Sequence, residues 1–139
     1  MEDFSKYAIK DYKYWQVQIH PDQSHLGRCV IWCLRKEAED LAGATPEEQT
    51  ELFQILKDLC SAITQAFQAN WFNYSFLGNK SHHLHGHFIP RYESPREFAG
   101  ITFTDEQWGH NPYKGPKKDF VTSPELLEQV QTKLKKVLR

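Results

Sequence analysis

The sequence has few cysteines, no long apolar run and no excess of charge of either sign. Its three cysteines, Cys29, Cys33 and Cys60, are an odd number, which argues against a disulfide framework and favours reduced thiols in a cytoplasmic protein. No segment is apolar enough to suggest a membrane span, and the charged N-terminal residues do not resemble a secretion signal. The 17 basic and 18 acidic residues nearly cancel, so we expect neither nucleic acid nor membrane as a partner, and any affinity for phosphate must be local.

The amino-acid composition of the chain is typical of a globular domain. A hydrophobic fraction of 40%, with four tryptophans, allows 139 residues to bury a core, and we expect one domain over residues 1–139. Cys29 and Cys33 stand four apart inside an apolar run. This spacing favours one face of a strand over a zinc site.

Four strands are predicted from alternating apolar residues and from the turn-forming residues between them. Residues 12–19 and 28–34 read as an antiparallel pair joined by a loop. Residues 71–77 form an aromatic-rich strand, and residues 82–89 form a last strand that Pro90 should terminate.

Two helices are predicted from their start signals. Residues 45–48 read Thr-Pro-Glu-Glu, which supplies an N-cap, a proline suited to the first helical position and a capping box. The apolar spacing that follows predicts a long helix to about residue 69. Residues 123–125, Ser-Pro-Glu, open a C-terminal helix, and residues 93–122 show no sustained period and read as a long surface segment.

The most informative feature is a run of histidines at residues 82–89, which read HHLHGHFI. In a strand, His83, His85 and His87 would share one face, while the residues between them pack beneath the sheet. Imidazole is partly neutral and partly charged near neutral pH, so neighbouring histidines can divide nucleophile, proton-transfer and anion-binding roles. Three imidazoles at this spacing therefore indicate a site for catalysis or anion binding.

With these residues the sequence is identified as a member of the histidine triad family, whose signature is His-x-His-x-His followed by two apolar residues, here residues 83–89. A Pro-Arg pair follows at residues 90–91, a Gly-Arg pair at residues 27–28 opens the upstream strand, and residues 41–53 are similar to the family's approach to its main helix. The likeness covers residues 12–91. Within the family the chain most resembles the branch of dinucleoside polyphosphate hydrolases.

The resemblance implies an α+β domain with a five-stranded antiparallel sheet and the long helix packed on it, followed here by the C-terminal helix. It also implies a homodimer with both active sites near the dimer interface. The small-molecule partner would be a nucleotide.

The resemblance further implies a nucleotide hydrolase or nucleotidyl transferase that acts at the α-phosphate of a dinucleoside polyphosphate or a related conjugate. His85 would attack phosphorus and form a covalent nucleotidyl-histidine, which water then hydrolyses. This requires a bare nitrogen on His85, so its other ring nitrogen should donate to a backbone carbonyl near His83. His87 would donate to a phosphate oxygen or to the leaving group, and His83 would orient the site.

Substrate contacts are expected in the turn before the triad. Asn79 matches a family amide that binds ribose or phosphate, although capping the hairpin explains it equally well. The connection to the triad is shorter than in relatives that carry a Ser or Thr phosphate donor there, and Lys80 or Ser81 could substitute.

Further substrate contacts are expected from two other parts of the chain. His20 stands near the position where relatives have Asp or Asn on the ribose hydroxyls, and His20 or Gln23 can hydrogen-bond a hydroxyl. Arg91 could reach the distal phosphates. We expect no required cofactor and no bound metal, with a divalent cation entering only as a counter-ion of the substrate.

Three alternatives stay open at this stage. The bond broken could be a phosphoramidate, as in a nucleoside phosphoramidase. The histidines could instead ligate zinc, but side chains on one strand point in parallel and do not converge. A non-catalytic nucleotide-binding protein would use the same pocket, although it would not need a nucleophile at His85.

Overall fold

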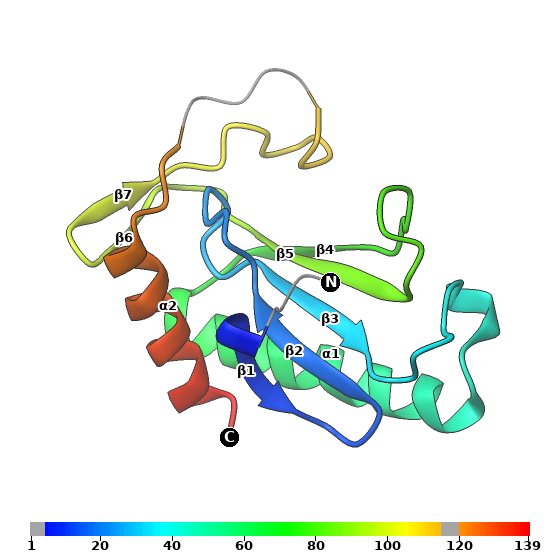
Figure 1. Ribbon diagram of the computed structural model, residues 1–139. Coiled ribbons are helices and arrows are strands. Elements are labelled where there is room, and N and C mark those ends of the chain that lie inside the picture. Colours follow the sequence, from blue (N-terminus) through cyan, green and yellow to red (C-terminus); the bar gives the residue numbers. More distant parts are fainter. Residues whose placement is uncertain (1–4, 115–119) are drawn as a thin grey trace.

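The computed structural model describes residues 5–114 and 120–139, and it centres on a five-stranded antiparallel sheet with the strand order β1-β2-β3-β5-β4 (Figure 1). The strands are β1 Ala8–Asp11, β2 Trp15–Ile19, β3 Cys29–Cys33, β4 Trp71–Ser75 and β5 His85–Arg91. The other elements are the helices α1 Pro46–Phe67 and α2 Pro124–Val137, the hairpin strands β6 Arg96–Phe98 and β7 Ile101–Phe103, and the short 3-10 helices η1 Ser5–Tyr7 and η2 Leu41–Gly43. The predicted α+β fold, with its long helix and C-terminal helix, is confirmed.

The start of α1 has the predicted capping box. The Thr45 hydroxyl accepts a hydrogen bond from the Glu48 amide at 3.1 Å, and the Glu48 carboxylate accepts one from the Thr45 amide at 2.8 Å. Pro46 begins the helix, where its missing N–H leaves no intrahelical bond unmade. The helix ends at Phe67, because Gln68 adopts the left-handed conformation with φ 54°.

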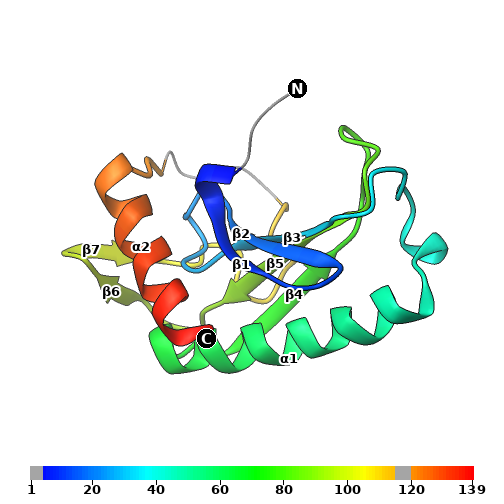
Figure 2. The same ribbon diagram turned by 60° about the horizontal axis from the view of Figure 1, so that its bottom comes forward.

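One face of the sheet is covered by α1, which runs along its length (Figure 2). The indole N–H of Trp15 on β2 donates to the Glu48 carbonyl at 2.9 Å and joins the two layers. On β5, Gly86 and Phe88 are buried towards the helix, so His85 and His87 face the other way. The core therefore lies between sheet and helix, and the opposite sheet face is left for the histidines.

The N-terminal strand pair differs from the prediction. β2 begins only at Trp15, because the Tyr12 amide donates to the Trp15 carbonyl at 2.8 Å in a tight turn. Before that turn, β1 pairs with β2 and supplies the fifth strand. Residues 8–11 read Ala-Ile-Lys-Asp, which carries no clear alternation, so only the family resemblance predicted a fifth strand.

The bounds of β5 are also corrected. The prediction that Pro90 terminates the strand is wrong, since β5 continues to Arg91. Cys29, the first residue of β3, pairs with Phe88, so Pro90 lies beyond the end of β3 and pairs only with Phe72 on β4. Proline is tolerated here, because no neighbouring strand stands on the side where its missing N–H would have donated.

The segment at residues 93–122 is more ordered than the prediction of an aperiodic surface segment. β6 and β7 form a hairpin, and Phe103 at its end is buried, with its ring 5.4 Å from that of Phe120. Within this segment, residues 115–119 lie outside the described residues. The surface prediction therefore holds only for parts of the segment.

The C-terminal helix α2 begins as predicted, with the Ser123 hydroxyl accepting a hydrogen bond from the Leu126 amide at 3.1 Å. Its buried face includes Leu126 and Leu134, and Gln131 donates to the Ala8 carbonyl at 3.0 Å. Figure 1 shows α2 beside β1 and the β6–β7 hairpin. In the described ranges, no helix is long and apolar enough to span a bilayer.

Candidate functional site

The three histidines of the signature meet on the uncovered face of the sheet. His85 and His87 alternate along β5, are half-buried, and have ring centroids 5.6 Å apart. His83 lies just before the strand, so the prediction that it belongs to a strand is corrected. Its Nε2 is 2.6 Å from the Cys33 carbonyl oxygen, and its ring stacks on Trp32 at 4.3 Å.

His85 makes the hydrogen bond that a nucleophile at this position needs. Its Nδ1 lies 2.6 Å from the carbonyl oxygen of His83. A carbonyl only accepts, so Nδ1 carries the proton and donates it. In the neutral ring Nε2 is then bare, and its lone pair is available for attack.

His87 lies beside a buried arginine that the sequence did not point to. Nη2 of Arg28 is 3.2 Å from Nδ1 of His87. Burial, followed by the charges of Arg28 and His85, lowers the pKa of His87 to about 4. His87 is therefore neutral at physiological pH.

His20 lies beside the triad, with its ring centroid 5.6 Å from that of His87. Its Nδ1 accepts a hydrogen bond from the Asp22 amide at 3.0 Å, so the proton of the neutral ring is on Nε2. Burial, followed by the charge of Arg28, lowers the pKa of His20 to about 3. His20 thus adds a second neutral imidazole donor next to His87.

Gln23 does not occupy the expected position, and the prediction that it binds a substrate hydroxyl is corrected. Its side chain is fully buried, at 0% exposure. The amide nitrogen donates to the carbonyls of His20 and Arg28, and the amide oxygen accepts from the Gly27 amide at 2.8 Å. Gln23 therefore shapes the loop that holds His20 and Arg28, with no group left for a ligand.

Arg91 is likewise committed to the protein interior, which corrects its predicted role on distal phosphates. Its guanidinium donates to both carboxylate oxygens of Asp105, to Asn73 and to the His110 carbonyl. Burial opposes ionisation of Asp105, but the His25 ring, 3.5 Å away, and the hydrogen bonds from Arg91 outweigh it and hold the pKa of that carboxyl well below its usual range. Arg91 anchors the segment at residues 105–110 to β5.

Asn79, Lys80 and Ser81 lie exposed on the connection from β4 to β5. Figure 1 shows this connection projecting beyond the sheet. Within the described structure their side chains form no hydrogen bond with the triad. They are thus in reach of solvent, and a contact with substrate requires a ligand that extends towards this loop.

The structure adds neighbours that sequence reasoning missed. The Trp32 ring lies 5.3 Å from that of His85, and the Ser75 hydroxyl is 3.1 Å from the Tyr113 hydroxyl. Trp32 could have been found, because it alternates with the buried positions of β3 and so shares the triad face. Tyr113 comes from an aperiodic segment whose sequence gives no signal of its position.

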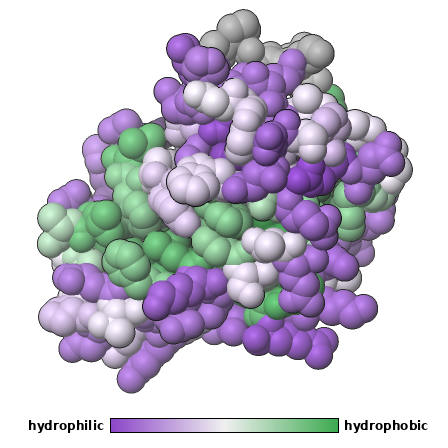
Figure 3. All heavy atoms as spheres, turned by 180° about the vertical axis from the view of Figure 1, so that it is seen from behind, coloured by the Kyte–Doolittle hydropathy of each residue, from purple (hydrophilic) through white to green (hydrophobic). Residues whose placement is uncertain are grey.

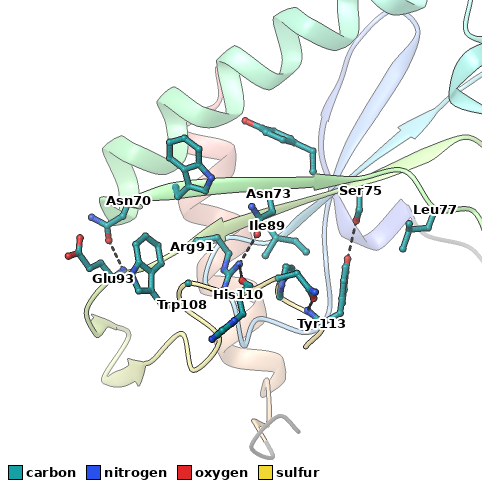
Figure 4. Close-up of a pocket in the computed structure, with 15 residues that line it drawn as sticks. Asn70, Asn73, Ser75, Leu77, Ile89, Arg91, Glu93, Trp108, His110 and Tyr113 are labelled. Carbon is teal, nitrogen blue, oxygen red and sulfur yellow. Dashed lines mark hydrogen bonds between the residues drawn. The ribbon is translucent and has the colours of Figure 1, made fainter. Parts of the chain in front are cut away.

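A cavity of about 920 Å³ lies on the same sheet face, next to the triad. Figure 4 shows Arg91 directed towards Asn73 and His110, and Tyr113 directed towards Ser75. Ser75 pairs with His87 across the sheet, which places the cavity beside the site. Its size lies within the range of small-molecule pockets.

No metal centre is formed by the part of the chain that the structure describes. No group of three His, Cys, Asp or Glu side chains in these ranges could hold a metal ion. The triad imidazoles are engaged instead with carbonyl oxygens and with Arg28.

Comparison with known proteins identifies the fold and the family. Residues 17–94, more than half of the chain, match the family model described as the HIT domain. No curated protein matches the chain.

Several solved structures are similar along nearly the whole chain. A histidine triad (HIT) protein from Sinorhizobium meliloti 1021 has a TM-score of 0.74 at 20% identity, covering 93% of this chain and 87% of that one. A histidine triad protein from Bradyrhizobium japonicum has a TM-score of 0.73 at 16% identity, covering 95% and 90%. A hypothetical histidine triad nucleotide-binding protein from Sulfolobus tokodaii strain7 has a TM-score of 0.70 at 18% identity, covering 95% and 83%. At these identities the likeness shows the fold.

Proposed function

The chain belongs to the HIT domain family, and on this premise we propose that it is a nucleotide hydrolase or nucleotidyl transferase of the dinucleoside polyphosphate hydrolase branch. The substrate is a dinucleoside polyphosphate, such as a diadenosine polyphosphate, or a related nucleotide conjugate. The observation that carries the proposal is the hydrogen bond from Nδ1 of His85 to the His83 carbonyl, which leaves Nε2 bare. A neutral nitrogen held in this way is a nucleophile that needs no metal.

The proposed reaction has two steps. Nε2 of His85 attacks the α-phosphorus, a P–N bond forms, and the P–O bond to the leaving group breaks with its electron pair on the departing oxygen. His87 donates a hydrogen bond to a phosphate oxygen or to the leaving group, which relieves the developing charge. Water then attacks the same phosphorus, the P–N bond breaks with its electron pair returning to Nε2, the water releases a proton to solvent, and neutral His85 is regenerated.

The His83 carbonyl supports both steps. When His85 attacks, its ring becomes positively charged, and a carbonyl acceptor at 2.6 Å from Nδ1 stabilises that charge. His83 itself is fixed by the Cys33 carbonyl and by Trp32, so the acceptor has a defined position. This arrangement supports the orienting role proposed for His83.

The proposed substrate contacts are His20 and the connection between β4 and β5. His20 presents an N–H that suits a ribose hydroxyl or a phosphate oxygen. Asn79, Lys80 and Ser81 would bind the polyphosphate chain from the exposed connection. We propose no required cofactor, and a divalent cation enters only as a counter-ion of the phosphates.

The test is intact-mass spectrometry after rapid quenching of the protein with a panel of dinucleoside polyphosphates, nucleoside phosphoramidates and nucleotidyl sugars. The proposal predicts a nucleotide-sized mass increment that is absent in His85→Ala. The matched control is His82→Ala, which removes an exposed histidine three residues upstream and should keep the increment. Turnover of the phosphoramidates alone would show that the protein breaks a P–N bond of its substrate and is a nucleoside phosphoramidase. Tight nucleotide binding without any increment would support a non-catalytic binding protein.

We also propose that the protein is a homodimer that pairs through the edge strand β4. Trp71 on this strand is 66% exposed and Phe53 on α1 is 65% exposed. Cys60 on α1 lies 3.2 Å from the Tyr74 hydroxyl, which makes the helix and the strand edge one surface. Figure 3 shows a band of hydrophobic residues with hydrophilic margins on the face seen from behind. An exposed edge with apolar side chains is a typical pairing surface.

Sedimentation equilibrium tests this assembly. The wild-type protein should have the mass of two chains, and Trp71→Glu combined with Phe53→Glu should shift it to the mass of one. Val121→Glu, at a residue that is 82% exposed, serves as a control that leaves the mass unchanged. A wild-type protein with the mass of one chain at micromolar concentration would refute the dimer.

We place the proposed enzyme in the cytoplasm on the state of its cysteines. All three are free, and Cys29 and Cys33 are buried in β3. Burial raises the pKa of the Cys29 thiol, so this cysteine is an unreactive core residue. Free thiols suit a reducing compartment, and fractionation of host cells with an antibody against the protein tests the location.

A further inference from the structure

We infer that Arg28 is a positioning residue that fixes His87 with its proton on Nε2. The inference concerns a residue for which neither the signature nor the proposed reaction assigns a role. The expected effect on the reaction rate rests on the proposed function, whereas the expected tautomer of His87 does not.

The first argument is the direction of the hydrogen bond between the two side chains. Nη2 of Arg28 lies 3.2 Å from Nδ1 of His87. A guanidinium only donates and stays protonated, so Nδ1 must be the acceptor. A neutral imidazole that accepts at Nδ1 carries its proton on Nε2. His87 is thereby set as a donor, whereas His85, which donates from Nδ1, is set as an acceptor and nucleophile at Nε2.

The second argument is that Arg28 is held rigidly from both sides. Its amide donates to the His25 carbonyl at 3.0 Å, and its carbonyl accepts from the His20 amide at 3.0 Å and from the Gln23 side chain. The guanidinium carbon lies 5.9 Å from the centre of the Tyr113 ring, in a cation–π arrangement. A side chain anchored in this way can dictate the orientation of its neighbour.

The third argument is the burial of Arg28 beside the triad. The residue is 6% exposed, and in the described ranges its Nε has no hydrogen-bond partner. Burial lowers the pKa of Arg28 and outweighs the charge of Asp22, which favours the guanidinium. A buried cation with an unused N–H beside the triad suits an anionic ligand. A phosphoryl group at His85 would supply that negative charge. The fixed cation of the site is then an arginine, which does not titrate, in place of a protonated histidine.

The experiment is nitrogen-15 NMR of histidine-labelled protein without substrate at neutral pH, with the His87 signals assigned from His87→Gln. In the wild type we expect the proton on Nε2 of His87 and on Nδ1 of His85. Arg28→Met should give His87 a mixture of both tautomers, and Arg139→Met, which removes an exposed arginine at the chain end, should leave the wild-type pattern. A proton on Nδ1 of His87 in the wild type would overturn the inference, and this measurement does not depend on the variant folding.

The second readout is the rate of adduct formation with a diadenosine polyphosphate. Arg28→Met should slow it by up to about 100-fold, the low end of what a positioned proton donor contributes, because only the fraction of His87 with its proton on Nε2 can still donate. Arg28→Lys keeps a buried cation and should retain more of the rate than Arg28→Met. If NMR gives the expected tautomers but no adduct forms, the proposed function fails and the role of Arg28 stands. If adducts form at the wild-type rate in Arg28→Met, the role of Arg28 fails and the proposed function stands.

Discussion

The ring of Phe76 occupies the space where a side chain at Gly86 would lie. A Cβ added to Gly86 would clash with ring atoms of Phe76. Gly86 stands between His85 and His87 on β5, and Phe76 directly follows β4. The absence of a side chain at this one position therefore lets an aromatic ring support the triad strand from below.

Gly86→Ala should lower the free energy of unfolding by about 1–3 kcal/mol, because the ring cannot stay in place beside a methyl group. Urea denaturation measures this loss. Gly43→Ala is the matched control, since an added Cβ there meets nothing within 4 Å.

The same clash predicts rescue by a smaller neighbour. In the double variant Gly86→Ala with Phe76→Leu, the loss should be smaller than the sum of the two single losses. Additive losses would mean that the two side chains do not compete for this space.

Asp105→Asn should destabilise the protein by about 3–5 kcal/mol, because Arg91 would be left buried without its carboxylate. Urea denaturation against Glu39→Gln, an exposed carboxylate, provides the comparison. A change equal to that of the control would show that Arg91 does not depend on this pair.

Stability should fall as the pH drops from 7 to 5, because two histidines resist protonation only in the folded state. The pKa of His87 is lowered to about 4 and that of His20 to about 3, from an ordinary value of 6.5. Above that value both rings are neutral in both states and contribute nothing. Below it the unfolded chain binds protons that the folded chain does not, so the free energy of unfolding should decrease by on the order of 1–3 kcal/mol after allowance for partial exposure.

Denaturation curves at both pH values check this dependence. The variants His87→Gln and His20→Gln should each flatten it, because each removes one of the two groups. A free energy of unfolding that is equal at pH 7 and pH 5 in the wild type would contradict the lowered pKa values.

The sequence predicts the parts of this protein that depend on local signals. The capping box at Thr45 is confirmed because the cap bonds involve residues three apart. Alternation correctly separates His85 and His87 from the buried positions of β5. Residues 8–11 lack alternation, and the strand they form depends on pairing with β2.

The parts that could not be predicted depend on contacts between distant residues. Arg91 reads as a phosphate ligand until Asp105, fourteen residues away, is seen to accept from it twice. Gln23 reads as a polar loop residue until the fold closes a loop around its amide. The role of Arg28 can be inferred only from its contact with His87, which follows 59 residues later.

The central claim is that a bare nitrogen of His85 takes a nucleotidyl group from the substrate, and peptide mapping of the rapidly quenched protein tests it most directly. With a radiolabelled α-phosphate in a diadenosine polyphosphate, the label should be acid-labile, base-stable and confined to the peptide that contains His85. Label on another residue, or catalysed turnover with no labelled peptide at any quench time, would contradict the account.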